Sequence, residues 1–483
     1  MTLAEHTPVT RHRVVMAVAS EIERDARVKK TALAVADAGH DVTLVFGCLN
    51  AADAGDATLG AVRTTGLHVP YLLRDDAARR GKDGSRSRPF LIGFRDRKEM
   101  QAALLRSTLR SERAARRSPV HRALARSSAM LARVRGRLYR EHVRRTQAQQ
   151  ADHAGRQRGR VDWRRALPNI GDLTLTFTKP LWRSEPDVIH IHDVHLLEAG
   201  ALAKQRLLSQ GKRVRLVYDA HEYIAGTSAP TPALEAAWKA LEAEFMPYVD
   251  DVITVSEPIA DAIQQRYGLE RRPSVVLNTP TNSGQAPAAS DIRTACGLPP
   301  STTLLAYSGV LSAKRGIRTA IEGLADVPDA HLAVVCVPNA HYRGALALSD
   351  YAQTLGVADR VHLVEPVATD EIISFLSTAD IGVHPMIGGL ANHEMALPNK
   401  LFDYLFAGLP VVVSDVRLMG QFVRDHGVGE PFRPEDPADF ARAVRAVMAD
   451  EDRYRKNAAR DDLRAELSWE NQAEQIRALY ADM

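Results

Sequence analysis

Short apolar runs of strand length alternate with amphipathic stretches of helical length along most of the chain. The first apolar run covers residues 13–20, a helical stretch covers 27–38 and ends at Gly39, and a second apolar run covers 41–46. The alternation resumes at residue 187 and continues through the rest of the sequence. A strand, a helix and a second strand at this spacing predict a parallel β-α-β unit, so we expect an α/β protein.

The alternation falls into two series, separated by residues 279–299. This stretch is rich in Pro, Ser, Asn, Gly and Ala and is expected to be a linker. The pattern predicts two Rossmann-like domains, residues 1–280 and 281–466, and a C-terminal helix, residues 467–483. The strands expected after the first two cover residues 187–192, 213–218, 251–255, 274–277, 304–308, 330–336, 361–364, 381–384 and 409–413.

Residues 74–165 interrupt this rhythm as a basic insertion in the first domain. Residues 71–165 hold 27 Lys/Arg against 9 Asp/Glu, whereas the whole chain has a net charge of only +4. Residues 120–143 have the pattern of a basic amphipathic helix. Three interpretations stay open: a solvated insertion, a helix lying on an anionic membrane surface, and a nucleic-acid-binding segment. The insertion lacks a set of aromatic residues for stacking on bases, which disfavours nucleic acid.

Composition adds limits on the class of protein and its compartment. Apolar residues make up 45% and charged residues 25% of the 483 positions, as in soluble globular proteins. Cys48, Cys296 and Cys336 lie far apart in or beside apolar segments, so we expect buried thiols in a reducing cytosol. The N-terminal residues lack the apolar core of a signal peptide, and no apolar run reaches membrane-spanning length. We therefore expect a cytoplasmic protein whose membrane contact, at the inner face, is peripheral.

The most informative stretch is residues 395–415. Pro398 and Asn399 are typical of a helix start, and Gly408 is typical of a helix end. A short helix is therefore expected over 400–407, followed by a buried strand. Lys400 and Asp403 lie three residues apart and share a face near the helix N-terminus, where free N–H groups suit a phosphate. An ordinary solvated Lys–Asp pair is the alternative interpretation.

This stretch resembles the nucleotide-binding motif of family 4 glycosyltransferases, which reads P-[ST/N]-K-x-x-E-Y-x-x-x-G-x-P-V-V. The matching residues are Pro398, Asn399, Lys400, Tyr404, Gly408, Pro410, Val411 and Val412. Asp403 stands at the second glutamate of the family's E-x7-E motif, and Met395 stands at the first, with Glu394 beside it. Residues 309–316 resemble the loop G-R-L-x-x-x-K-G, with Val310 at the arginine and Arg315 at the lysine. Residues 468–480 resemble the closing helix of the family.

The resemblance implies the GT-B fold, in which two Rossmann-like domains face a cleft. It also implies a nucleotide-diphosphate-sugar donor, transfer with retention of anomeric configuration, and no obligate metal or other cofactor. The acceptor would be a glycan, a lipid-linked glycan or a small molecule. The donor sugar, its base, the linkage and the oligomeric state stay undetermined.

The same resemblance nominates residues for the site. Arg315 and Lys400 would neutralise the diphosphate, with Lys314 or Arg27 in place of the missing family arginine. Asp403 would bind the ribose, and Asn399 lies at the start of the same helix. For catalysis the resemblance of residues 190–193 nominates His192. His221 is added because it follows the next strand, and Glu394 because it could cover the sugar from the second domain; buried structural residues are the alternative interpretation.

Two further features concern the first domain. His190 and His192 alternate along one strand and should share a face; as a metal site the pair lacks an evident third ligand. Asp25 and Arg27 belong to a loop that resembles a D-x-R-V variant of the family, with a helix cap and a solvated arginine as the alternative.

Two rival functions remain at this stage. A sugar-nucleotide epimerase shares the GT-B architecture. A non-catalytic protein on a degenerate GT-B scaffold, binding an anionic surface or nucleic acid, is favoured by Met395, Val310 and the basic insertion.

Overall fold

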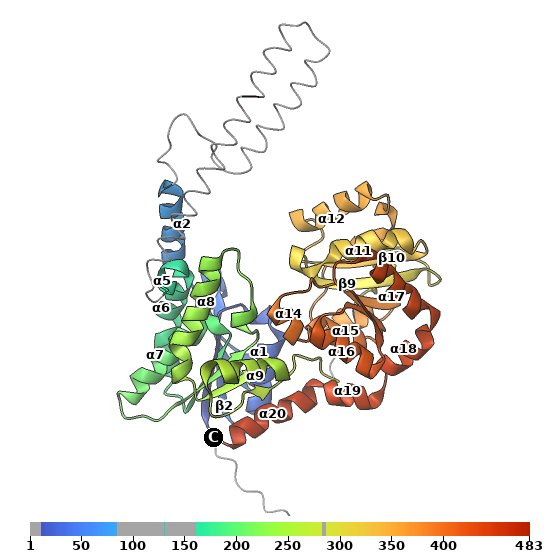
Figure 1. Ribbon diagram of the computed structural model, residues 1–483. Helices are drawn as coiled ribbons and strands as arrows, with labels where there is room; N and C mark the ends of the chain where they lie inside the picture. The colour runs from blue at the N-terminus through green and yellow to red at the C-terminus, as the bar shows by residue number, and fades with distance from the viewer. Residues whose placement is uncertain (1–10, 85–129, 131–160, 283–285) are drawn as a thin grey trace, which may run out of the picture. The chain divides into compact units, whose positions relative to one another are not determined.

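A computed structural model describes residues 11–84, 130, 161–282 and 286–483 (Figure 1). The chain divides into two compact units, one formed by Met1–Pro70 with Trp163–Met483 and the other by Tyr71–Asp162. In the second unit, helix α2 covers Leu72–Gly84. The amphipathic helix expected over 120–143 lies outside the described residues, apart from Met130, and membrane contact through the insertion stays a prediction.

The first sheet has eight strands in the order β3-β4-β2-β1-β5-β6-β7-β8. All neighbouring pairs are parallel except β3 with β4. The strands are β1 Arg13–Val18, β2 Asp41–Cys48, β3 Gly55–Leu59, β4 Val62–His68, β5 Val188–His192, β6 Arg215–Ala220, β7 Asp251–Thr254 and β8 Ser274–Val275. The helices between them are α1 Ala26–Asp37, α5 Trp163–Ala166, α6 Pro168–Arg183, α7 Leu197–Leu208, α8 Pro232–Phe245 and α9 Glu257–Tyr267.

The second sheet has six parallel strands in the order β11-β10-β9-β12-β13-β14. They are β9 Thr303–Val310, β10 Ala330–Val337, β11 Val361–Val364, β12 Ile381–His384, β13 Val411–Ser414 and β14 Gly429–Phe432. The helices of this half are α10 Ile292–Ala295, α11 Ile317–Gly323, α12 Arg343–Thr354, α13 Ile372–Leu376, α14 Ala391–Met395, α15 Asn399–Phe406, α16 Arg417–His426, α17 Pro437–Ala449, α18 Glu451–Ala458 and α19 Asp461–Leu467. The expected α/β class with two parallel sheets is confirmed.

The end of the chain packs with its beginning. Helix α20, Trp469–Ala481, buries Trp469, Ala473, Ile476 and Tyr480 in the hydrophobic core of the first sheet. These positions follow the helical period, so one face of α20 is apolar and covers the sheet. The hydroxyl of Tyr480 lies 2.8 Å from Nδ1 of His190 in strand β5. The first core therefore contains residues from both ends of the sequence.

The expected linker over 279–299 is shorter in the structure. Asp291 caps α10, whose first residue, Ile292, is fully buried in the core of the second sheet. Arg293 forms a 2.7 Å ion pair with Asp380, just before strand β12. The second half therefore begins inside the predicted linker, because one apolar residue among polar ones fixes α10 to the core.

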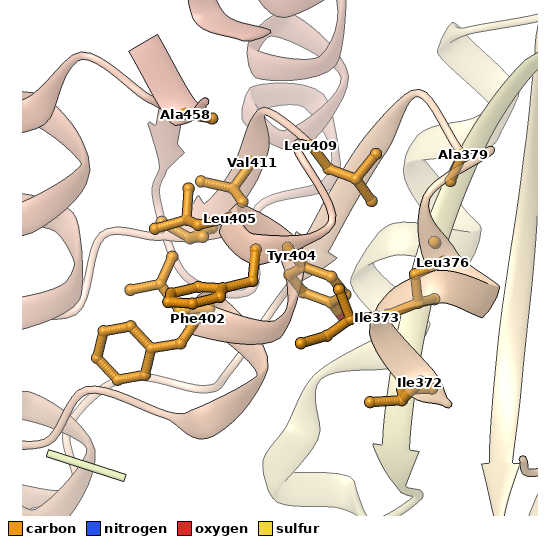
Figure 2. Close-up of a cluster of buried hydrophobic side chains, with 14 of the residues drawn as sticks. Ile372, Ile373, Leu376, Ala379, Phe402, Tyr404, Leu405, Leu409, Val411 and Ala458 are labelled. Atoms are coloured by element: carbon orange, nitrogen blue, oxygen red, sulfur yellow. The ribbon is translucent and has the colours of Figure 1, made fainter. Parts of the chain in front are cut away.

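Helix α15 is held by its apolar face (Figure 2). Leu401, Phe402, Tyr404 and Leu405 are almost fully buried, in a cluster that also contains Ile373 and Leu376 of α13. Burial of each large side chain contributes about 1.5–3 kcal/mol, which fixes the orientation of the helix. The hydroxyl of Tyr404 accepts from the amide of Ser308 and donates to the carbonyl of Val383. Lys400 and Asp403 are thereby directed away from the core.

Among the described ranges, no helix combines the length and apolar character needed to cross a bilayer.

Strands β3, β4 and β14 were not expected from the sequence, since their short, mixed-polarity segments lack a clear apolar run.

Candidate functional site

The site on the first sheet begins where β5 and β6 end side by side. His192 and Asp219 are register partners at the ends of these strands. Arg27, from the first turn of α1, binds the Asp219 carboxylate through Nε at 2.9 Å and Nη2 at 2.7 Å. Both side chains are at most 2% exposed. The solvated arginine considered from the sequence is therefore replaced by a buried bidentate ion pair.

Two histidines share the same carboxylate. Nδ1 of His192 and Nε2 of His221 lie 3.3 and 3.4 Å from Oδ2 of Asp219. On its other side, Nδ1 of His221 lies 3.4 Å from Oδ2 of Asp193. His192 is fully buried, whereas the His221 and Asp193 side chains are 17% and 34% exposed. A substrate can therefore reach the side chains of His221 and Asp193, but not that of His192.

The charges of these groups follow from their surroundings. Burial lowers the pKa of His221, but Asp193 and Asp219 outweigh it and raise that pKa to about 9. His221 is therefore a cation at neutral pH. Burial also lowers the pKa of His192, so this ring stays neutral. Burial disfavours the Asp219 carboxylate, yet Arg27 and His221 hold its pKa well below the usual value.

Asp193 has an unusual backbone conformation. Its φ is 63° and its ψ is 158°, a region that residues other than glycine rarely adopt. Its amide donates to the carbonyl of Asp219 at 3.0 Å, which anchors the turn. Strain of this kind costs about 1–3 kcal/mol and persists where the surrounding structure fixes it. Here it directs a carboxylate toward His221.

His190, His192 and Asp219 lie close enough for three of their ligand atoms to surround a metal ion, within 4.8 Å of one another. The rings of His190 and His192 stack at 4.5 Å on one face of the strand. However, both oxygens of Asp219 already accept hydrogen bonds from the Arg27 guanidinium. A divalent cation here would lie beside a buried arginine and the His221 cation, so this set fits a metal poorly.

On the second sheet, the Arg315 loop is held against strand β12. Gly316 follows Arg315 with φ +62°, and a Cβ at Gly316 would lie 1.8 Å from the carbonyl oxygen of Pro385. Only glycine allows this close approach. Gly309, at the end of β9, would place a Cβ 3.6 Å from Cε of Lys400. The Arg315 loop, the end of β12 and Lys400 of α15 therefore lie close together.

Lys400 and Asp403 form an ion pair of 3.0 Å at the start of α15, with side chains 32% and 14% exposed. The N-cap residue is Pro398, which offers no side-chain cap to the first turn that Asn399 begins. A phosphate can therefore approach both the helix N-terminus and the Lys400 ammonium group.

Lys314 is directed elsewhere. Its Nζ donates to the carbonyl of Ser228 at 2.8 Å, so it joins the two halves of the chain.

His384 was not anticipated from the sequence. It ends β12, is 1% exposed, and stacks on Tyr307 at 6.3 Å. Burial, followed by the charges of Arg315 and Lys400, lowers its pKa to about 3. The Arg315 loop packs on Pro385, the residue after His384, and Cε of Lys400 packs at Gly309, two residues after Tyr307. The ends of β9 and β12 therefore bring Arg315 and Lys400 to one region. In the sequence, only the position of His384 at the end of a strand could have indicated that it lies at a ligand-binding edge of the sheet.

The Glu394 side chain links two backbone segments. Oε1 accepts from the amide of Gly389 at 3.0 Å, and Oε2 accepts from the amide of Arg417 at 2.7 Å. It thereby fixes the Gly389 loop to the N-terminus of α16. The backbone carbonyl of Met395 accepts a hydrogen bond from Ser256 of the first half. A catalytic role for Glu394 stays a prediction.

Both halves of the chain match models of known families. Residues 121–283 match the model described as Glycosyltransferase Family 4, and residues 302–450 match the model described as Glycosyl transferases group 1. Glycogen synthase of Mycobacterium tuberculosis is 27% identical over 304 residues, which cover 62% of this chain and 69% of that protein.

Solved structures share the fold over nearly the whole chain. Sucrose-phosphate synthase from Thermosynechococcus elongatus has a TM-score of 0.65 at 15% identity, covering 97% of this chain and 98% of its own. Anabaena Alr3699/HepE in complex with UDP-glucose has a TM-score of 0.58 at 13% identity, covering 98% and 100%. The GT-B fold is thus confirmed, and the chain belongs to the family 4 glycosyltransferases.

Proposed function

We propose that this glycosyltransferase moves a sugar from a nucleotide-diphosphate sugar to an acceptor hydroxyl, with retention of anomeric configuration. The acceptor class is a glycan, a lipid-linked glycan or a small molecule. The observation that carries the proposal is the geometry at the ends of β9 and β12, where the Arg315 loop packs on Pro385 and Lys400, paired with Asp403, packs at Gly309. The UDP-glucose complex of the related fold supports the choice of donor class.

The chemistry assigned to the second half concerns the leaving group. Departure of the nucleoside diphosphate increases negative charge on its terminal phosphate. Fixed cations stabilise that charge without reorganisation, and Arg315 and Lys400 would supply them. The proposal therefore needs no obligate metal ion. Asp403 can accept hydrogen bonds from two ribose hydroxyls, and it already accepts one from Lys400 at 3.0 Å.

The chemistry assigned to the first half concerns the sugar and the acceptor. The His221 cation lies between two carboxylates and is partly accessible. It can donate a hydrogen bond to the transferred sugar or to a phosphate oxygen, while Asp193 can accept from a hydroxyl. His192 is buried and would act indirectly, because it orients the Asp219 carboxylate that His221 also contacts.

Titration with nucleotide sugars tests the proposal. UDP-, GDP- and ADP-sugars are titrated by calorimetry against the wild type, Lys400→Ala and the control Lys456→Ala, an exposed lysine on α18. Loss of one phosphate-binding cation should weaken nucleotide binding at least tenfold, about 1.4 kcal/mol or more, in Lys400→Ala and less than twofold in the control. EDTA should leave wild-type turnover unchanged. Absence of binding to every donor, or equal binding by the two variants, would refute the proposal.

A further inference from the structure

Two segments of the chain run together between the halves. Residues 277–282 leave the first sheet, and residues 468–472 return to it at the start of α20. The amide of Leu277 donates to the Gln472 side chain at 2.9 Å, and the amide of Trp469 donates to the carbonyl of Pro280 at 2.8 Å. We call these paired segments the crossover. Residues 277–282 are irregular backbone and residues 469–472 are the first turn of α20, so the geometry of the crossover depends on the hydrogen bonds between them.

The amide of Asn282 adds a third link. It donates to both carboxylate oxygens of Glu470, at 3.2 and 3.0 Å. The crossover is therefore fastened by backbone and side-chain groups along its length, and it connects the two halves twice.

Lys30 of α1 contacts both segments of the crossover. Its Nζ donates to the carbonyl of Thr279 at 2.5 Å and lies 3.4 Å from Oδ1 of Asn278. The same ammonium group lies 4.5 Å from the centroid of the Trp469 ring. A cation in this position attracts the ring face as well as the carbonyl oxygen. One side chain of the first domain thus joins the outgoing and the returning segments.

Charged groups from three elements act on Lys30. Arg27 and Asp25 belong to α1 or its cap, Glu470 belongs to α20, and Asp403 belongs to α15 at the donor-binding region. Burial and then Arg27 lower the pKa of Lys30 to about 8, while the three carboxylates oppose this shift. The Lys30 ammonium group is therefore charged at pH 7 and loses its proton near pH 8.

We propose that Lys30 is a positioning residue for sugar transfer, acting through the crossover that it fastens. The proposal rests on the function proposed above and adds a residue remote from the reacting atoms. Lys30 fixes the two connecting segments, which carry the second half and its Asp403 relative to the Arg27–Asp219 cluster. Loss of the ammonium group should release the crossover and slow turnover, because a small displacement of catalytic groups costs much of the rate.

The test compares Lys30→Met, Lys30→Arg and the control Lys29→Met. Methionine keeps the length of the side chain without its charge, and arginine keeps the charge at every pH used. Lys29 is the neighbouring residue. Within the described residues, its Nζ donates a hydrogen bond to the nearby carbonyl of Glu23 and none to the crossover. Two readouts are measured: hydrogen exchange of the peptides covering 277–282 and 468–472, and turnover of the donor as a function of pH.

In Lys30→Met we expect at least tenfold faster exchange in both peptides and at least tenfold lower kcat, with nucleotide affinity within threefold of the wild type. Lys30→Arg should restore protection and keep its activity through pH 8, where the wild type begins to lose it. Exchange in Lys30→Met equal to that in Lys29→Met would overturn the proposal, whatever the activity. Absence of donor turnover in the wild type would instead count against the proposed function.

Discussion

Substitution of Asp219 by asparagine tests the central ion pair of the first domain. Asp219 accepts two hydrogen bonds from Arg27, and the two side chains are 1% and 2% exposed. Asparagine has nearly the same shape but no charge, and its amide group can accept on one side only. The Arg27 charge would then be buried without a counterion, with the asparagine oxygen and the carbonyl of Val276, at 2.8 Å, as its acceptors.

The expected cost follows from this burial. Removal of one partner from a buried pair typically costs about 3–5 kcal/mol, because the remaining charge is desolvated without compensation. Total stabilities are about 5–15 kcal/mol, so Asp219→Asn should remove a large share of the free energy of unfolding. The control is Asp261→Asn, whose carboxylate pairs with Arg272 at 2.8 Å but is 68% exposed. An exposed pair contributes about 0–1 kcal/mol.

Urea denaturation followed by circular dichroism at pH 7 measures both variants. Arg27 holds the pKa of Asp219 well below 3.8, so its stabilisation is present above that pH and is lost as the pH falls below it. The difference between wild type and Asp219→Asn should therefore be constant from pH 5 to 6, below the range in which the stabilisation linked to His221 changes. A cost within about 1 kcal/mol of the control would refute our account of the Arg27–Asp219 pair.

Two further predictions concern a glycine and a histidine. Gly316→Ala should destabilise the Arg315 loop by more than the about 1–2 kcal/mol expected for left-handed backbone alone, because the new Cβ would lie 1.8 Å from the Pro385 carbonyl oxygen. Gly356→Ala, with φ +71° and no atom within 4 Å, isolates the backbone contribution, and equal melting temperatures would contradict the clash. For His221, whose pKa is raised to about 9, stabilisation is fully present below its ordinary value of 6.5 and is lost as the pH rises through 9. The free energy of unfolding of wild type relative to His221→Gln should therefore fall by up to about 3 kcal/mol between pH 6.5 and 10, and a flat difference in urea titrations would disprove the protonated state.

The sequence predicts the strands and helices well, but it does not show which distant side chains contact one another. Strands such as β1, β10 and β13 are mainly apolar, and their burial on both faces explains why their apolar runs can be recognised in the sequence. Arg27 and Asp219 are separated by 192 positions, so their pairing appears only when the sheet is assembled. The same holds for the region around His384, since Arg315 lies in the loop after β9 and Lys400 lies on α15.

Local spacing succeeds where the partners share one helix. Lys400 and Asp403 were expected to share a face and form an i,i+3 ion pair in the structure. Lys314 shows the limit of such reasoning, since adjacency to Arg315 says nothing of the Ser228 carbonyl that it binds.

The packing of α20 on the first sheet has a consequence for biosynthesis. The core that contains Val14 and Met16 also needs Trp469, Ile476 and Tyr480. During translation, the second half can complete its own core while the first still exposes an apolar surface. That surface stays available to chaperones or to aggregation until residue 480 has left the ribosome. The half of the enzyme that is synthesised first is therefore the half that matures last.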